Sequence, residues 1–134
     1  VIFDLDGTLL DTLDDLADSG NRILADVGLP GHSREAYRYF VGDGLQTLVR
    51  RILPQDRRDD ENIMRFKEAF RDDYGQNWKV KTKVYDGVDA MLTRLQNQGV
   101  VLSILSNKPH DFTRMCVREF LGAWKFDVVS GLRP

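Results

Sequence analysis

The chain has 134 residues, near the usual size of one domain, with 19 Lys and Arg against 21 Asp and Glu. Its formal net charge of -2 gives no general attraction to nucleic acid or to an anionic membrane, so we expect neither partner and require a local site for any anion. A single cysteine, Cys116, excludes an intrachain disulfide, and no apolar run approaches the roughly 20 residues of a membrane helix, so we expect a soluble protein in a reduced, cytoplasmic setting.

The first predicted element is a buried strand at residues 1–5, an apolar run closed by a turn at Asp6 and Gly7. Apolar residues then recur at helical spacing up to Gly28, which predicts a helix. Three more helices and no strand are predicted next: one capped by Ser33 that runs through Phe40, one marked by Leu45, Leu48, Val49 and Ile52 and stopped at Pro54, and one marked by Ile63, Phe66, Phe70 and Tyr74 that ends at Gly75. A helical module therefore follows the first strand.

The second half of the chain returns to strands. A basic connector at residues 79–83 leads into a helix that ends before Gly99. Residues 100–105 form a nearly continuous apolar run, which is typical of a parallel strand covered on both faces. Pro109 suits the first turn of a further helix, which reaches Gly122.

A last strand is predicted at residues 126–129, and the order of the elements indicates an α/β fold. We expect a Rossmann-like parallel sheet core at residues 1–13 and 84–134, with a helical-bundle cap inserted at residues 14–83. Ligands of open α/β sheets bind beyond the carboxyl ends of the strands, which is where the insert leaves the core. The cap is therefore expected to form a roof that opens and closes over the site.

Two carboxylates, Asp4 and Asp6, stand two residues apart where the first strand emerges. An isolated Asp-Gly pair is commonly only a turn. A calcium loop is a second alternative, but it requires glycine at its sixth position, where this chain has Leu9.

Three segments resemble the haloacid dehalogenase superfamily. Its motif I is similar to residues 1–12, with the sequence VIFDLDGTLLDT, and its motif II, a strand that ends in Ser or Thr, is similar to residues 101–107, VLSILSN. The cap segment of phosphoglycolate phosphatase-like members, in which a Gly-x-Gly turn points toward the active site, is similar to residues 40–53, FVGDGLQTLVRRIL. The resemblance covers essentially the whole chain. The motif III lysine and the motif IV acids are expected downstream of residue 134, so we expect the C-terminal part of the core to be missing.

The resemblance implies a Mg²⁺-dependent phosphoric monoester hydrolase that acts on a small phosphorylated metabolite, similar to phosphoglycolate, through an aspartyl phosphate. It makes Asp4 the nucleophile and Asp6 the acid/base, and both of them metal ligands. A cation is needed because a phosphate monoester repels an attacking carboxylate, and Mg²⁺ prefers oxygen ligands. The implied phosphate ligands are Thr8, Ser106, Asn107 and Lys108, and the implied substrate loop of the cap is Gly42, Asp43 and Gly44. Lys108 can equally be a solvated lysine.

Four rival functions are weaker. A dehalogenase or a phosphonate hydrolase would lack Asp6. A sugar phosphomutase keeps both acids, but by resemblance it carries basic residues in the cap turn, where residues 41–46 contain none. A non-enzymatic phosphoaccepting signalling domain has no helical insert after its first strand. A phosphatase is thus favoured, with phosphoglycolate, other small phosphomonoesters and pyrophosphate open as substrates.

Overall fold

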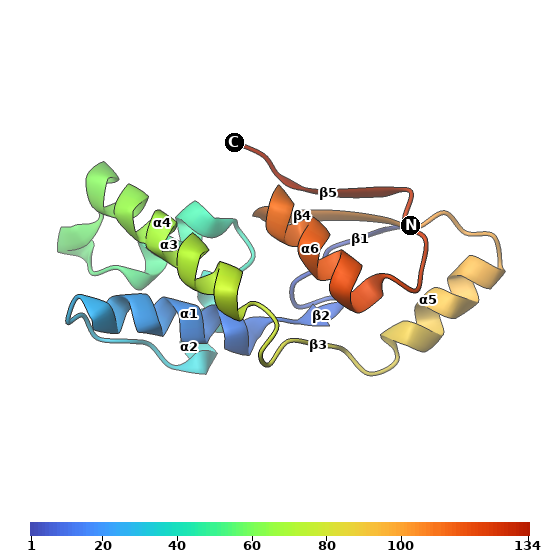
Figure 1. Ribbon diagram of the computed structural model, residues 1–134, viewed down its shortest axis with the longest axis horizontal. Helices are drawn as coiled ribbons and strands as arrows, with labels where there is room; N and C mark the ends of the chain where they lie inside the picture. The colour runs from blue at the N-terminus through green and yellow to red at the C-terminus, as the bar shows by residue number, and fades with distance from the viewer. The chain divides into compact units, whose positions relative to one another are not determined.

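The computed structural model describes residues 1–134, which divide into two compact units (Figure 1). The first unit consists of residues 1–11 and 83–134, and the second of residues 12–82. The first contains a parallel sheet with helices and the second is helical, so the predicted α/β fold class is confirmed. None of the helices combines the length and the apolar character that a membrane span requires.

The first unit is built on a three-stranded parallel sheet. Its strands follow the order β1 (Ile2–Phe3), β4 (Ser103–Pro109) and β5 (Val128–Leu132). Helix α5 (Val88–Asn97) precedes β4, and helix α6 (His110–Leu121) connects β4 to β5 and packs on both strands (Figure 1). The buried core includes Leu5, Leu92, Leu102, Ile104, Cys116 and Leu121.

The middle strand of this sheet differs from the prediction in two ways. It begins at Ser103 and continues to Pro109, because pairing with β5 resumes at Leu132 after a register shift. The predicted phosphate ligands 106–108 therefore lie within the strand and not after it. One face of the sheet is also uncovered, because Leu105 and its same-face neighbours Ile2 and Val128 are exposed.

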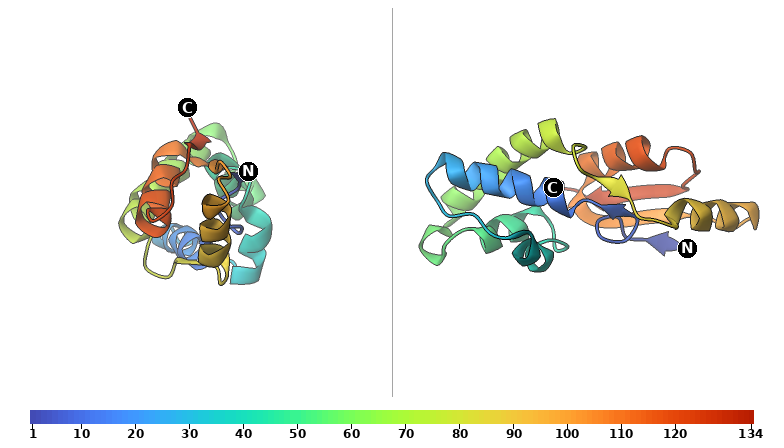
Figure 2. Two further views of the ribbon diagram at one scale, coloured as in Figure 1. Left: turned by 90° about the vertical axis from the view of Figure 1, so that its right-hand side faces the viewer. Right: turned by 90° about the horizontal axis from the view of Figure 1, so that it is seen from below.

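A second, two-stranded sheet was missed by the sequence analysis. Strand β2 (Leu10–Asp11) pairs in antiparallel fashion with β3 (Lys83–Val84), beside which it lies in Figure 2. Each strand has only two residues, which is too short for a period-two pattern to be visible. The pair stands at the two points where the chain passes from one unit to the other.

The second unit is a bundle of four α-helices: α1 (Leu13–Asp26), α2 (Arg34–Phe40), α3 (Leu45–Ile52) and α4 (Asp60–Asn77), with a short 3-10 helix at Gln55–Arg57. As expected, Ser33 caps α2, and its side chain accepts a hydrogen bond from the Ala36 N–H at 3.1 Å. Helix α4 runs through Gly75, where an end was predicted. A glycine ends a helix when it adopts the left-handed conformation, and Gly75 does not adopt it.

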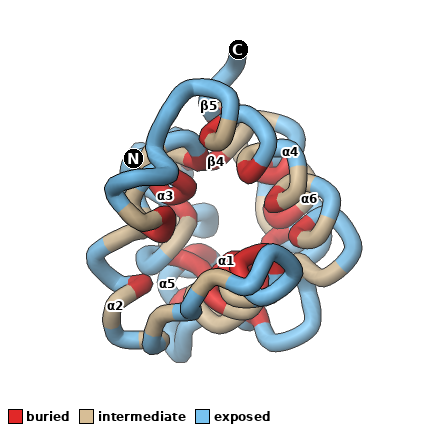
Figure 3. Tube along the Cα trace, turned by 90° about the vertical axis from the view of Figure 1, so that its left-hand side faces the viewer, coloured by how far each residue is buried: buried red, intermediate tan, exposed pale blue.

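The core of the helical unit lies between α1, α3 and α4, with α1 and α3 both packed on α4. Exposed positions lie on the outer sides of these helices and buried positions face inward (Figure 3). The largest fully buried side chains of this unit include Tyr37, Phe70 and Tyr74. Burial of such apolar surface is the main source of the unit's stability.

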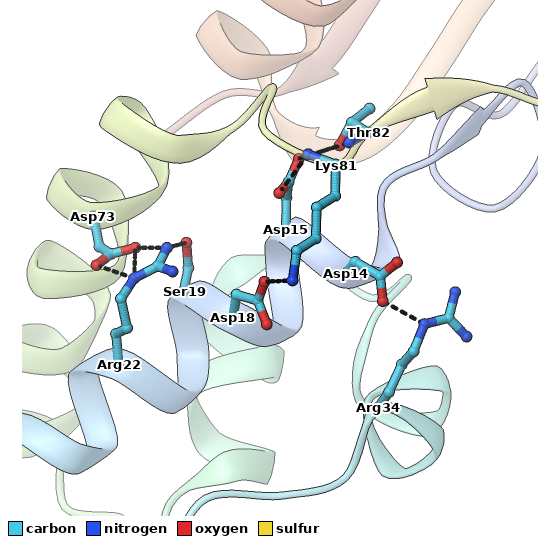
Figure 4. Close-up of polar contacts among 9 residues, drawn as sticks. All are labelled: Asp14, Asp15, Asp18, Ser19, Arg22, Arg34, Asp73, Lys81 and Thr82. Atoms are coloured by element: carbon cyan, nitrogen blue, oxygen red, sulfur yellow. Dashed lines mark hydrogen bonds and ion pairs between the residues drawn. The ribbon is translucent and has the colours of Figure 1, made fainter.

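A bidentate ion pair joins two of these helices (Figure 4). Arg22 on α1 donates to Asp73 on α4 through Nη2, 2.7 Å from Oδ1, and through Nε, 2.9 Å from Oδ2. Burial tends to raise the pKa of Asp73, but hydrogen bonds from Arg22 and Ser19 outweigh it, so the pKa lies below its ordinary value of 3.8.

Replacing Asp73 with Asn is expected to destabilise the folded protein at neutral pH and to have little effect in acid. A carboxylate with a lowered pKa stabilises the fold above pH 3.8, and this contribution is lost as the pH falls through the lowered value. Since Arg22 is partly exposed, we expect a loss of about 1 kcal/mol in the free energy of unfolding at pH 7. Urea unfolding of the wild type and the variant, from neutral pH down into acid, measures this loss. The exposed neighbour Asp72, changed to Asn, is the matched control, and a difference that stays constant with pH would contradict the assignment.

Candidate functional site

The two predicted carboxylates lie on one tight turn after β1. The carbonyl oxygen of Leu5 accepts hydrogen bonds from the N–H groups of residues 8, 9 and 10, and Gly7 takes a positive φ of 75°. Asp4 is exposed, and its Oδ1 accepts a hydrogen bond from the Leu5 N–H at 2.7 Å. The turn therefore fixes both acids at the carboxyl end of a strand of the parallel sheet.

A buried lysine reaches this turn from the neighbouring strand. Lys108 Nζ lies 3.0 Å from Asp6 Oδ1, and the two side chains are only 4% and 16% exposed. Burying an ammonium group is costly without a hydrogen-bond partner, and the Asp6 carboxyl supplies one. Lys108 is thus not the solvated lysine that the sequence also allowed. Its contact with Asp6 was missed, because the two residues are 102 positions apart in the chain.

The other predicted phosphate ligands differ in exposure. Ser106 is buried, and its Oγ accepts a hydrogen bond from the Lys108 N–H at 3.1 Å. A hydroxyl that accepts one hydrogen bond still has its own proton to donate. Asn107, the next residue along β4, is exposed, and so is Thr8 in the turn after β1. These four residues belong to the same unit as the two acids.

The predicted substrate loop belongs to the second unit, where it joins α2 to α3. Gly42 and Gly44 both have positive φ, at 112° and 92°, and Gly44 is the N-cap of α3. Asp43 forms an ion pair with Arg51 at 2.8 Å, and Arg51 also donates to the carbonyl groups of residues 39 and 40. The turn itself contains no basic residue, so the sequence alone did not indicate an ion pair here. The cation is Arg51, near the end of α3.

The donor set at the strand end suits a magnesium ion. The acids on this turn are Asp4 and Asp6, and no group of three or more His, Cys, Asp or Glu side chains in the structure could hold a metal ion. Mg²⁺ is commonly held by one or two carboxylates, with water and substrate phosphate completing its shell. Ions that require three or more nitrogen or sulfur ligands do not fit this arrangement.

Comparison with known proteins gives a consistent result. The family described as "Haloacid dehalogenase-like hydrolase" matches residues 1–134. A curated protein named phosphoglycolate phosphatase from Pseudomonas putida is 40% identical over 116 residues, which cover 84% of this chain and 42% of that protein. A second with the same name, from Pseudomonas savastanoi pv. phaseolicola, is 40% identical over 136 residues, which cover 98% of this chain and 50% of the relative. The chain thus spans about half the length of these relatives.

A solved structure supports the same likeness. The crystal structure of a predicted phosphoglycolate phosphatase from Haemophilus somnus aligns with a TM-score of 0.85 at 31% identity. The alignment covers 97% of this chain and 60% of that one. Both units of the chain, the sheet and the helical bundle, thus have counterparts in a single solved protein.

Proposed function

The chain belongs to the haloacid dehalogenase-like hydrolase family, and we propose that it acts as a Mg²⁺-dependent phosphatase that hydrolyses a small phosphomonoester through an aspartyl phosphate on Asp4. The observation that carries the proposal is the turn after β1. It places Asp4 in the open and ties Asp6 to a buried lysine at the carboxyl end of the sheet. The names of the relatives favour phosphoglycolate as the substrate.

Asp4 and Asp6 carry the two displacements. A carboxylate oxygen of Asp4 attacks phosphorus, the bond from phosphorus to the alkoxy oxygen breaks, and the protonated Asp6 gives its proton to that oxygen to release the alcohol. Water then attacks the aspartyl phosphate and loses a proton to Asp6, and the bond between phosphorus and Asp4 breaks to release inorganic phosphate. Both acids end in their starting states, and one difficult hydrolysis becomes two easier steps.

The end of β4 supplies donors for the phosphate oxygens. The Ser106 hydroxyl, the Asn107 amide and, from the first turn, Thr8 are the proposed ligands. The N-terminus of α6, a helix of 12 residues that begins at His110, adds a favourable dipole for an anion. The helical unit is proposed to act as the cap, with residues 42–44 as its substrate loop.

A magnesium ion fits beside these groups. Asp4 and the backbone carbonyl of Asp6 would hold it, and it would screen the phosphate charge that otherwise repels an attacking carboxylate. The protein's own part is to keep the Asp4 carboxylate at a fixed position. The hydrogen bond from the Leu5 N–H to Asp4 does so.

Phosphate release from a panel of metabolites tests this function on the protein at its natural length. We expect hydrolysis of p-nitrophenyl phosphate that stops when Mg²⁺ is chelated, and the highest kcat/KM on phosphoglycolate among small phosphomonoesters and pyrophosphate. Isomerisation of a sugar phosphate without net phosphate release would favour the mutase alternative. Phosphate release that survives chelation, or none on any substrate, would contradict the proposal.

A further inference from the structure

Behind Lys108 lies a fully buried hydroxyl that the reaction outlined above does not use. Thr113 on α6 is 0% exposed, and its Oγ1 lies 3.2 Å from the carbonyl oxygen of Lys108 and 3.0 Å from that of Pro109. A threonine in a helix often bonds the carbonyl four residues back, which here is Pro109. The contact with Lys108 reaches one residue further, beyond the start of the helix. Thr113 therefore ties α6 to the end of β4.

The edge strand β5 approaches Thr113 and Lys108 very closely. A Cβ atom added to Gly131 would lie 2.5 Å from the carbonyl oxygen of Lys108 and 2.7 Å from Cα of His110, and it would also strike the Thr113 hydroxyl. The Gly131 N–H donates to Nδ1 of His110 at 3.0 Å, which holds β5 at this distance. Only glycine fits here without displacing the backbone on which Lys108 is carried.

Both peptide groups of Lys108 are thus fixed. Its N–H donates to Ser106 Oγ at 3.1 Å, and its carbonyl accepts from Thr113. With its backbone held on both sides, the Lys108 side chain extends through a buried path to Asp6 Oδ1. Few alternative positions are open to its ammonium group, since protein interiors are closely packed.

We infer that Thr113 and Gly131 are positioning residues: they fix the backbone of Lys108 so that its ammonium group holds the Asp6 carboxyl in the orientation needed for proton transfer. The inference rests on the proposed function, because it takes Asp6 to be the acid/base. In this inference Lys108 binds the Asp6 carboxyl and is not a ligand of the substrate phosphate. Disturbing Thr113 or Gly131 should then slow the proton-transfer step and leave substrate binding unchanged.

Two substrates separate this role from a purely structural one. The alkoxide of an alkyl phosphate must be protonated as it leaves, whereas p-nitrophenolate leaves as a stable anion and needs little help from an acid. In Thr113→Val, which keeps the side-chain shape and loses the hydroxyl, we expect the single-turnover rate of phosphoenzyme formation from the best alkyl phosphate of the panel to fall by about 10²-fold, with KM changed by less than about twofold. The fall on p-nitrophenyl phosphate should be at least about tenfold smaller.

Further variants complete the test. Thr113→Ser restores the donor and should recover most of the lost turnover, while Gly131→Ala and Lys108→Met should reproduce the substrate-dependent loss. Ser19→Ala is the matched control. It also removes a buried hydroxyl, but from the helical unit, and should leave the turnover of both substrates unchanged. Circular dichroism and Tm report whether each variant is folded, and if Thr113→Val is not, Lys108→Met and Gly131→Ala decide.

Two results would overturn the inference. One is an equal loss in the rate of phosphoenzyme formation from both substrates, and the other is a rise in KM with kcat retained, which would make Lys108 a substrate ligand. Absence of turnover on both substrates in the wild type would instead overturn the proposed phosphatase function, so the two failures are distinguishable.

Discussion

Replacing Asp4 with Asn is expected to lower kcat by about 10⁴-fold or more, the scale on which loss of a nucleophile acts in other hydrolases, and to abolish the phosphoenzyme. The amide keeps the shape of the carboxylate and can still accept the Leu5 N–H, so the turn should be preserved. It is a far weaker nucleophile, because it carries no negative charge. Steady-state kinetics and mass spectrometry of acid-quenched enzyme measure the two effects together.

Asp89 provides a matched control for this substitution. Its Oδ1 accepts a hydrogen bond from the N–H of the next residue at 2.8 Å, as Asp4 does, and it is exposed at the start of α5 in the same unit. Asp89→Asn should retain wild-type turnover and phosphoenzyme. A phosphoryl group found on any residue other than Asp4, or Asp4→Asn activity within about tenfold of wild type, would refute the nucleophile assignment.

The largest stability effect is expected at Asp15, a buried carboxylate in the helical unit (Figure 4). Its two oxygens accept hydrogen bonds from the N–H of Lys81 at 3.0 Å, the N–H of Thr82 at 2.8 Å and the Thr82 hydroxyl at 2.7 Å. Asp15→Ala removes the acceptor from all of these donors, and the Thr82 groups are buried. We expect the free energy of unfolding, measured in urea, to fall by about 3 kcal/mol.

Asp18 is the control for Asp15. It lies one turn further along α1 and forms an exposed ion pair with Lys81 Nζ at 2.7 Å (Figure 4). Exposed ion pairs contribute little to the free energy of unfolding, so Asp18→Ala should barely change the unfolding transition. The explanation for Asp15 fails if both variants have the same effect.

Much of the helical unit could be predicted because its signals are local. Helix α3 contains the apolar positions that marked it and ends before Pro54, and Ser33 caps the helix that follows it. The sheet was harder. Strand β1 keeps only Ile2 and Phe3 of the predicted residues 1–5, because a strand's length depends on its partner as well as on its own sequence.

In the candidate site, too, the local features could be predicted and the long-range contacts could not. Asp4 and Asp6 were found because they are neighbours in the sequence, with a turn signal directly after them. The partner of Asp6, Lys108, comes from a distant strand, and no local pattern links the two. Gly131 was missed for a related reason. Position 131 requires a glycine because α6 comes very close to it, and that contact exists only in the folded protein, where β5 packs against α6.

The small pairing of β2 with β3 also bears on how the sheet can form. Ile2 in β1 pairs with Ser103 in β4, and closing so long a loop has a large entropic cost. The contacts within residues 12–82 do not involve the sheet, and the pairing of β2 with β3 brings together the two ends of this insert. Residues 4–9 and residues 85–102, which include α5, then separate this pair from β1 and β4. The search that joins β1 to β4 is therefore much more local than the sequence separation suggests.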